Sequence, residues 1–155
     1  MSSQRPAGAG VVIVGVDGSE ASKDALRWAL GYARLTGASV HALTAWQYPA
    51  NSAWAPAILD QLDLEGDARR ALKETIEEVI ASYQDVAVRS GVLEGTPGLV
   101  LVRAAANAEL LVVGSRGHGA FAGMLLGSVS EHCVHHASCP VVVIRRHQHH
   151  RDPSA

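Results

Sequence analysis

A glycine-rich segment in the last third of the chain carries the residues whose types and spacing point most directly to chemistry. Gly114 is followed after two residues by Gly117, and after nine more by Gly127 and Ser128. Glycines let backbone amides approach an anion, and a helix beginning at Ser128 adds its orphan amides and the positive end of its dipole. The spacing therefore predicts a phosphate-binding loop, whereas any one of these glycines alone is ordinary turn chemistry.

This segment differs from the two commonest nucleotide-binding motifs. A P-loop ends in Gly-Lys-Ser/Thr, and the dinucleotide fingerprint belongs after the first strand of a sheet. Asp17 is an acidic residue after an apolar run, but the sequence offers no clear second group that would position and activate water. We therefore expect a phosphate-binding protein with at most slow hydrolysis of its ligand and with no dedicated catalytic residues.

The elements that must position this loop alternate along the chain. Strands are predicted at five short runs rich in aliphatic and β-branched residues, at 11–16, 39–46, 85–93, 110–113 and 140–145. Helices are predicted between them from apolar residues at helical spacing and from the N-caps Ser19 and Thr96, at 20–36, 58–83, 97–107 and 128–136.

Strands that alternate with helices predict an α/β fold with right-handed crossovers. We expect a Rossmann-like, doubly wound, five-stranded parallel sheet with strand order 3-2-1-4-5 and helices on both faces. Ligands of such sheets bind at the carboxyl ends of the strands, near the point where the strand order reverses. This topology brings together Asp17, Ala45 with Trp46, and the loop that follows Gly114.

Three segments resemble the universal stress protein family. The stretch GSRGHGAFAGMLLGSVSEH contains the spacing G-x2-G-x9-G-Ser and resembles the ATP signature of the ATP-binding branch; another branch lacks these glycines. VGVDGS, which ends at Ser19, is similar to the family's first strand and loop, and HHASCPVVVIRR, at 135–146, to its closing helix and dimer-forming strand. The resemblance implies ATP with Mg²⁺ as the ligand, and a homodimer formed through the last strand.

The resemblance also implies roles for single residues. It implies a phosphate-holding set, which consists of Gly117, Gly127, Ser128 and Val129 with Ser130 close by. It implies a second set around the sugar and base, which consists of Gly15, Val16, Ala45, Val113 and Gly114. For Asp17 the resemblance implies a carboxylate that accepts from the ribose hydroxyls or helps to hold Mg²⁺; the alternative is a loop aspartate that caps the first helix. Arg116 follows the strand that precedes the loop, so its positive charge is expected either to balance the phosphate charge or to lie in solvent without a ligand.

Composition and charge narrow the other function classes. Of the 155 residues, 48% are apolar and 18% charged, which suits one buried core. We expect a nucleotide-binding domain at 10–146 between flexible tails at 1–9 and 147–155. A net charge of -2 without a basic stripe argues against nucleic acid. The sequence has neither a long apolar run nor a signal-peptide pattern, so we expect a cytoplasmic protein without membrane contact.

Histidines and cysteines gather near the C-terminus without a recognised metal-ligand spacing. His132 and His136 share a helix face, yet there is no Cys-x2-Cys pair, and we predict no metal site. Cys133 and Cys139 are expected to be reduced thiols, with Cys133 packed inward.

The three tryptophans are expected to differ in role. Trp28 has apolar neighbours at helical spacing, which predicts a core position. Trp46 and Trp54 follow the second predicted strand, which makes them candidates to flank a nucleotide.

The leading hypothesis is an ATP-binding stress-response or regulatory protein that acts as a nucleotide-dependent binding module. Three alternatives remain open at this point: a slow Mg²⁺-dependent ATPase, a module for another adenine nucleotide such as cyclic AMP, and an interaction protein with an empty site. The sequence does not indicate which protein, if any, is the partner of this module.

Overall fold

The aliphatic runs of the sequence form the strands of the computed structural model, which describes residues 10–49, 56–59, 61–116 and 126–146. The strands are β1 (Val11–Gly15), β2 (Ser39–Trp46), β3 (Val88–Glu94), β4 (Leu110–Gly114) and β5 (Val141–Ile144). The helices are α1 (Glu20–Thr36), α2 (Pro56–Leu59), α3 (Leu64–Ile80), α4 (Pro97–Ala104) and α5 (Ser128–His136).

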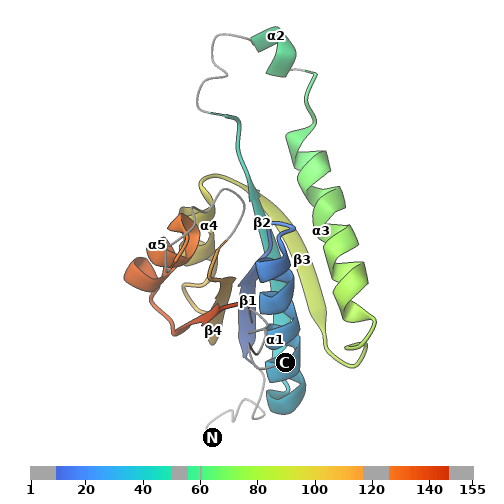
Figure 1. Cartoon of the computed structure of the whole chain (residues 1–155), viewed down its shortest axis with the longest axis vertical. Coiled ribbons are helices and arrows are strands. Elements are labelled where there is room, and N and C mark those ends of the chain that lie inside the picture. Colours follow the sequence, from blue (N-terminus) through green and yellow to red (C-terminus); the bar gives the residue numbers. More distant parts are fainter. Residues whose placement is uncertain (1–9, 50–55, 60, 117–125, 147–155) are drawn as a thin grey trace, which may run out of the picture.

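The five strands form one parallel sheet in the order β3-β2-β1-β4-β5, which confirms the predicted fold class and strand order. Val14 in β1 pairs with Ala42 in β2 on one side and with Val112 in β4 on the other. Helices α1 and α3 cover one face, and α4 and α5 cover the other (Figure 1). The strand order therefore reverses between β1 and β4, where such a sheet binds its ligand.

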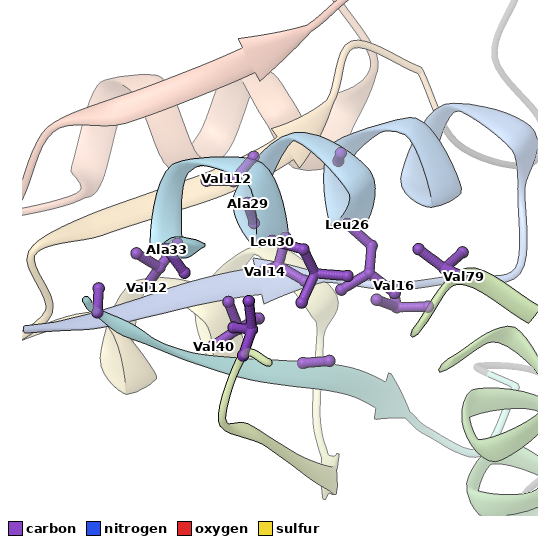
Figure 2. Close-up of a cluster of buried hydrophobic side chains, with 14 of the residues drawn as sticks. Val12, Val14, Val16, Leu26, Ala29, Leu30, Ala33, Val40, Val79 and Val112 are labelled. Atoms are coloured by element: carbon purple, nitrogen blue, oxygen red, sulfur yellow. The ribbon is translucent and has the colours of Figure 1, made fainter. Parts of the chain in front are cut away.

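Two separate cores lie on the two faces of the sheet, because alternate residues of a strand point to opposite sides. Val12 and Val14 of β1 pack with Leu26 and Leu30 of α1 (Figure 2), and all four side chains are buried. Ile13, between the two valines, belongs to the second cluster with side chains of α4 and α5. Burial of each such leucine contributes about 1.5–3 kcal/mol, so both faces hold β1 rigidly beside the predicted site.

The ends of α1 are the ones that the sequence predicts. Ser19 is the N-cap, and its Oγ accepts from the backbone N–H of Ser22 at 3.2 Å. Gly37 ends the helix with φ 76°, a left-handed conformation that suits glycine, and its N–H donates to Ala33 O at 2.8 Å. Because α1 starts directly after β1, the short turn at 16–19 is held at the carboxyl edge of the sheet.

The single helix predicted over 58–83 is wrong, because the chain forms two helices there. Asp63 leaves the helical region, with φ -99° and ψ 70°, and its Oδ1 accepts from Gly66 N at 3.0 Å. This N-cap begins α3 at Leu64, which lies after α2 and a turn. The apolar spacing that includes Leu62 predicts a continuous helix, whereas the side chain of Asp63 is a capping signal that starts a new helix.

The third strand begins at Val88 rather than at Asp85, because the residues before it form a turn held by α1. Arg34 of α1 donates through Nη2 to Asp85 Oδ1 at 2.7 Å and to Ser82 O at 2.6 Å. The guanidinium group holds the pKa of the exposed Asp85 carboxyl below its ordinary value. Helix α4 also ends earlier than predicted, at Ala104, because 105–107 form a turn.

The prediction that Trp28 lies in the core is wrong. Its side chain is 38% exposed and stacks on Tyr32 of the same helix, with ring centroids 5.5 Å apart. The buried stripe of α1 consists of smaller residues at the same helical spacing, including Ala25, Ala29 and Ala33. The apolar face of α1 is therefore narrower than the hydrophobic pattern suggested.

Candidate functional site

A cavity of about 710 Å³ opens at the carboxyl ends of β1, β2 and β4. This is the edge at which the fold class places a ligand, and the volume lies in the range of small-molecule sites. Every predicted site residue that the structure describes lines it, namely Gly15, Val16, Asp17, Ala45, Val113, Gly114, Arg116, Gly127, Ser128, Val129 and Ser130. Gly117 lies outside the described residues.

Gly114 allows the end of β4 to approach the first turn of α1 closely. A Cβ built at Gly114 would lie 2.9 Å from the carbonyl carbon of Ala21 and 3.0 Å from its carbonyl oxygen. These atoms belong to the backbone of α1, so they cannot turn aside as a flexible side chain would. Any side chain at 114 would therefore push α1 away from β4 and open the cavity wall.

Hydrogen bonds close the base of the predicted phosphate loop. Gly127 N donates to Ser115 O at 2.6 Å. Ser130 Oγ lies 2.9 Å from the same carbonyl oxygen and 3.0 Å from Gly127 O, and the residue is only 2% exposed. The buried hydroxyl therefore joins the two ends of the loop, and it positions Gly127 and Ser128 at the cavity.

Helix α5 points its N-terminus into the cavity. Its N-cap, Gly127, is extended with φ -75° and ψ 169°, and no side chain among the described residues caps the helix. Ser128 and Val129, the first two helical residues, both line the cavity. Amides in the first turn have no partner within the helix, and the helix dipole adds positive potential there. This arrangement favours an anionic ligand group.

Asp17 lies on the opposite wall, where β1 leads into α1. Its Oδ1 accepts from Ser19 N at 2.9 Å and from Ser19 Oγ at 2.5 Å. Ser19 is the N-cap of α1, so the carboxylate orders the turn from which the helix starts. The exposed residue also lines the cavity. The structure thus shows that Asp17 orders the turn, whereas its contact with ribose or Mg²⁺ stays a prediction.

The end of β2 offers backbone groups to the cavity at Ala45. Leu43 O accepts from Val16 N at 2.8 Å on the β1 side, whereas Trp46 O accepts from Gly95 N on the β3 side. In a parallel ladder the two sides alternate along the strand, so the N–H and C=O of Ala45 point toward the β1 side. β1 has ended at this level, after the pair of Gly15 with Leu43. The geometry suits recognition of a flat polar edge, as predicted for adenine.

The cavity has a further wall that the sequence analysis did not identify. It combines the first turn of α4 with neighbouring side chains, namely Gln47, Thr96, Pro97, Gly98 and His132. Ser22, Leu43 and Leu101 complete the lining. The Thr96-Pro97 signal did predict where α4 starts. Because α4 follows β3, the N-terminus of α4 lies at the same edge of the sheet as the other loops. The sequence analysis predicted this N-terminus but did not assign it to the site.

Two tryptophans proposed as neighbours of a nucleotide gain no support. The structure places Trp46 outside the lining of the cavity, where its ring meets Tyr48 edge to face with centroids 5.6 Å apart. Trp54 lies outside the described residues.

The histidines and cysteines of α5 and of the segment directly after it do not assemble a metal site within the described ranges. No group of three or more His, Cys, Asp or Glu residues there is arranged to hold a metal ion. His132 and His136 do share a helix face, with ring centroids 4.5 Å apart. Both cysteines are free thiols, and Cys133 is fully buried as predicted. Burial raises the pKa of the Cys133 thiol to about 11, so it stays protonated and unreactive at neutral pH.

No helix in the described ranges combines the length and the apolar character that crossing a bilayer demands.

Comparison with known proteins gives consistent matches. The model of the universal stress protein family matches residues 9–145. The chain is 40% identical over 134 residues to the universal stress protein Rv2623 of Mycobacterium tuberculosis, in an alignment that covers 86% of this chain and 44% of the relative. It thus spans about half the length of the curated relatives it matches.

Solved structures extend the similarity to the fold. The universal stress protein UspA from Lactobacillus plantarum superposes with a TM-score of 0.75 at 25% identity, covering 88% of this chain and 98% of that protein. A universal stress protein solved in complex with cAMP superposes with a TM-score of 0.65 at 28% identity, covering 87% and 96%. From the family match, the sequence relatives and the shared fold, we conclude that the chain belongs to the universal stress protein family.

Proposed function

We propose that this protein is a cytoplasmic regulatory protein that binds ATP in the cavity between β1 and β4, and that nucleotide occupancy changes its conformation or its choice of partner. The observation that carries the proposal is the N-terminus of α5, which no described side chain caps, with Gly127 and Ser128 facing a cavity of about 710 Å³. Such an N-terminus holds phosphate through amides and dipole. The cavity volume accommodates the nucleoside as well.

The remaining walls support the assignment of parts of the ligand. Ala45 turns backbone groups toward the position where adenine is expected, and Asp17 supplies a carboxylate on the wall beside it. Arg116, exposed at the rim, adds positive charge on the phosphate side. These residue types fit Mg²⁺-ATP, with the metal ion balancing phosphate charge beside Asp17 when it is bound. The relative solved with cAMP supports an adenine nucleotide in a fold of this kind.

The same relative gives a specific reason to test a second candidate. A site that holds cyclic AMP needs one phosphate position, which α5 alone provides, and the adenine and sugar walls would be unchanged. Cyclic AMP is therefore the competing ligand for this cavity.

A homodimer is the second part of the proposal. β5 lies at an edge of the described sheet, and its four residues, Val141–Ile144, are all aliphatic and half-buried. An apolar edge strand without a partner favours aggregation, and pairing with a second copy across a two-fold axis removes that edge.

The deciding experiment is isothermal titration of nucleotide-stripped protein with Mg²⁺-ATP. We expect the parent to bind, and Gly127→Glu and Ser128→Asp to weaken binding at least tenfold, because a carboxylate in the first turn repels phosphate. Ser128 is exposed and an acidic residue at this position favours the helix, so this variant separates ligand repulsion from misfolding.

Gly31→Glu is the matched control, because Gly31 lies in α1 and a Cβ built there meets no atom within 4 Å other than its chain neighbours and the nearby backbone of α1. It adds the same charge away from the cavity and is expected to bind like the parent. A folded parent that gives no heat with ATP would sink the proposal. Displacement of ATP by cyclic AMP at lower concentration would favour the second candidate.

A further inference from the structure

Trp28 is a large apolar side chain of α1 that belongs neither to the two described core clusters nor to the lining of the cavity. The residue is 38% exposed, and its ring stacks on Tyr32, one turn farther along the helix. Tryptophan combines a large apolar area with little side-chain freedom, and it is enriched in the centres of protein interfaces. The flank of α1 that carries Trp28 is therefore a candidate interaction surface.

Contacts on either side of Trp28 show which way this flank faces. Asp24, Trp28 and Tyr32 follow one another four residues apart, so they share one flank of the helix. Asp24 Oδ2 lies 4.0 Å from Arg146 Nε, two residues after β5. Tyr32 donates to Glu109 Oε1 at 2.9 Å, directly before β4. Trp28 lies between these two contacts, so it faces the edge of the sheet that β5 forms.

The opposite flank of α1 faces the other half of the sheet. Lys23 Nζ lies 3.0 Å from Glu78 Oε2 of α3. Arg34 binds Asp85 in the turn after α3. The charged residues of that flank are therefore paired within the chain, whereas the flank toward β5 presents an exposed tryptophan to the outside.

A two-fold axis that joins two β5 edges into one sheet brings the two Trp28 side chains toward each other. Such an axis runs perpendicular to the sheet, so both copies of α1 lie on the same face. Because α1 lies mainly over β1 and β4, the two helices would be four strand spacings, or roughly 19 Å, apart. Directly packed helices are only about 8–10 Å apart. Large side chains are therefore needed to fill the space between them.

Trp28 has the position and the surroundings that this space requires. It lies midway along its flank, between the contact with the carboxyl end of β5 and the contact with the amino end of β4. It is therefore level with the middle of β5, where the axis would pass. Val142 and Ile144, which point to the same face, provide an apolar floor from each copy.

The charges at the two ends of this edge are complementary under the same axis. The paired β5 strands are antiparallel, so the carboxyl end of one lies beside the amino end of the other. Arg145 and Arg146 are exposed after β5, and Glu109 is exposed before β4. Arg146 and Glu109 both contact the Trp28 flank of α1. Arg146 of each copy would thus approach Glu109 of the other, which favours this arrangement.

We propose that Trp28 anchors an interface with a second copy of this chain: the two Trp28 side chains fill the space over the joined β5 strands, and Arg146 pairs with Glu109 across the axis. The inference rests on the proposed homodimer and deepens it, because it assigns the contact to a helix flank and not to the strand alone. A large aromatic residue at the centre of an interface is the kind that carries most of the binding energy.

The first test measures the dissociation constant of self-association of the full chain by analytical ultracentrifugation. We expect Trp28→Ala to raise this constant roughly tenfold or more, because each dimer loses two central aromatic contacts. Trp28→Phe keeps an aromatic ring and is expected to recover part of the loss. Trp46→Ala is the matched control, because it makes the same change in β2, away from the β5 edge, and should self-associate as the parent does.

A charge reversal tests the two-fold arrangement without removing an aromatic ring. Arg146→Glu and Glu109→Arg are each expected to weaken the dimer, because each places like charges together across the axis. The double variant restores opposite charges in both pairs and is expected to recover the affinity. Lys73→Glu makes a charge change of the same kind on the exposed side of α3 and should leave the dimer unchanged.

Tryptophan fluorescence follows the same contact with the Trp28 side chain intact. In a protein with Trp46→Phe and Trp54→Phe, Trp28 is the one tryptophan left, and its emission is expected to shift to longer wavelength as dilution separates the copies. A Trp28→Ala protein with the dissociation constant of the parent would overturn the anchor and leave the homodimer standing. A double charge variant as weak as the single ones would overturn the two-fold pairing of Arg146 with Glu109. A parent that is monomeric at every concentration would overturn both this interface and the proposed homodimer.

Discussion

At the scale of single residues, the cavity is built from groups that also hold the fold together. Ser130 joins the ends of the loop, Asp17 orders the turn before α1, and Gly114 lets α1 approach β4. If a substitution of any of these residues abolished binding, the loss could come either from a missing ligand contact or from a change in the local structure. Ser128 is a better probe, because its exposed side chain reaches the cavity without a hydrogen bond of this kind among the described contacts.

The packing role of Gly114 leads to a prediction about stability. We expect Gly114→Ala to lower the free energy of unfolding by about 1–3 kcal/mol, because its Cβ meets the backbone of Ala21 and the helix must move. Urea denaturation followed by circular dichroism measures the difference.

Gly31→Ala serves as the comparison, because its Cβ meets nothing within 4 Å and the change should stabilise α1 by up to about 1 kcal/mol. If Gly114→Ala were as stable as the parent, the close approach of α1 to β4 would not depend on glycine, and a glycine at 114 would need another reason.

At the scale of elements, the sequence predicted what depends on local pattern and missed what depends on assembly. β2 and α5 have the predicted bounds, because an aliphatic run and a Gly-Ser start are local signals. The error over 58–83 came from reading apolar spacing without the cap at Asp63. The start of α4 was predicted from Thr96-Pro97, but its contact with α5 was not, because Gly98 and His132 lie far apart in sequence and neither one signals the other.

The contact between α4 and α5 predicts a coupled pair of substitutions. Gly98→Ala should destabilise the protein by about 1 kcal/mol or more, because the new methyl group meets the His132 ring at 2.8 Å. In a His132→Ala background the ring is gone, so the same change should cost little. Thermal or urea unfolding of the two single variants and the double variant gives the coupling energy, expected at about 0.5–3 kcal/mol. Additive effects would mean that the two helices do not meet at these residues.

At the scale of the whole molecule, the two edges of the sheet differ in a way that bears on assembly. β3 carries charged residues at the other edge, including Arg89 and Glu94, which discourage strand pairing. β5 is aliphatic throughout, at Val141–Ile144, and carries no such protection. If two copies pair through a sheet edge, β5 is therefore the edge that we expect them to use, and the ladder geometry shows which of its residues would meet the partner.

The backbone of β5 predicts a substitution that separates assembly from folding. Pro140 O and Ile144 O accept from Leu111 and Ser115 of the β4 side, and a parallel ladder alternates, so the N–H of Val143 points to the open edge. Val143→Pro removes that donor and is expected to yield a folded monomer by light scattering, with nucleotide binding retained. Val142→Pro removes a ladder bond to β4 and should lower the melting temperature instead. A Val143→Pro protein that remains dimeric would show that the copies associate through another surface.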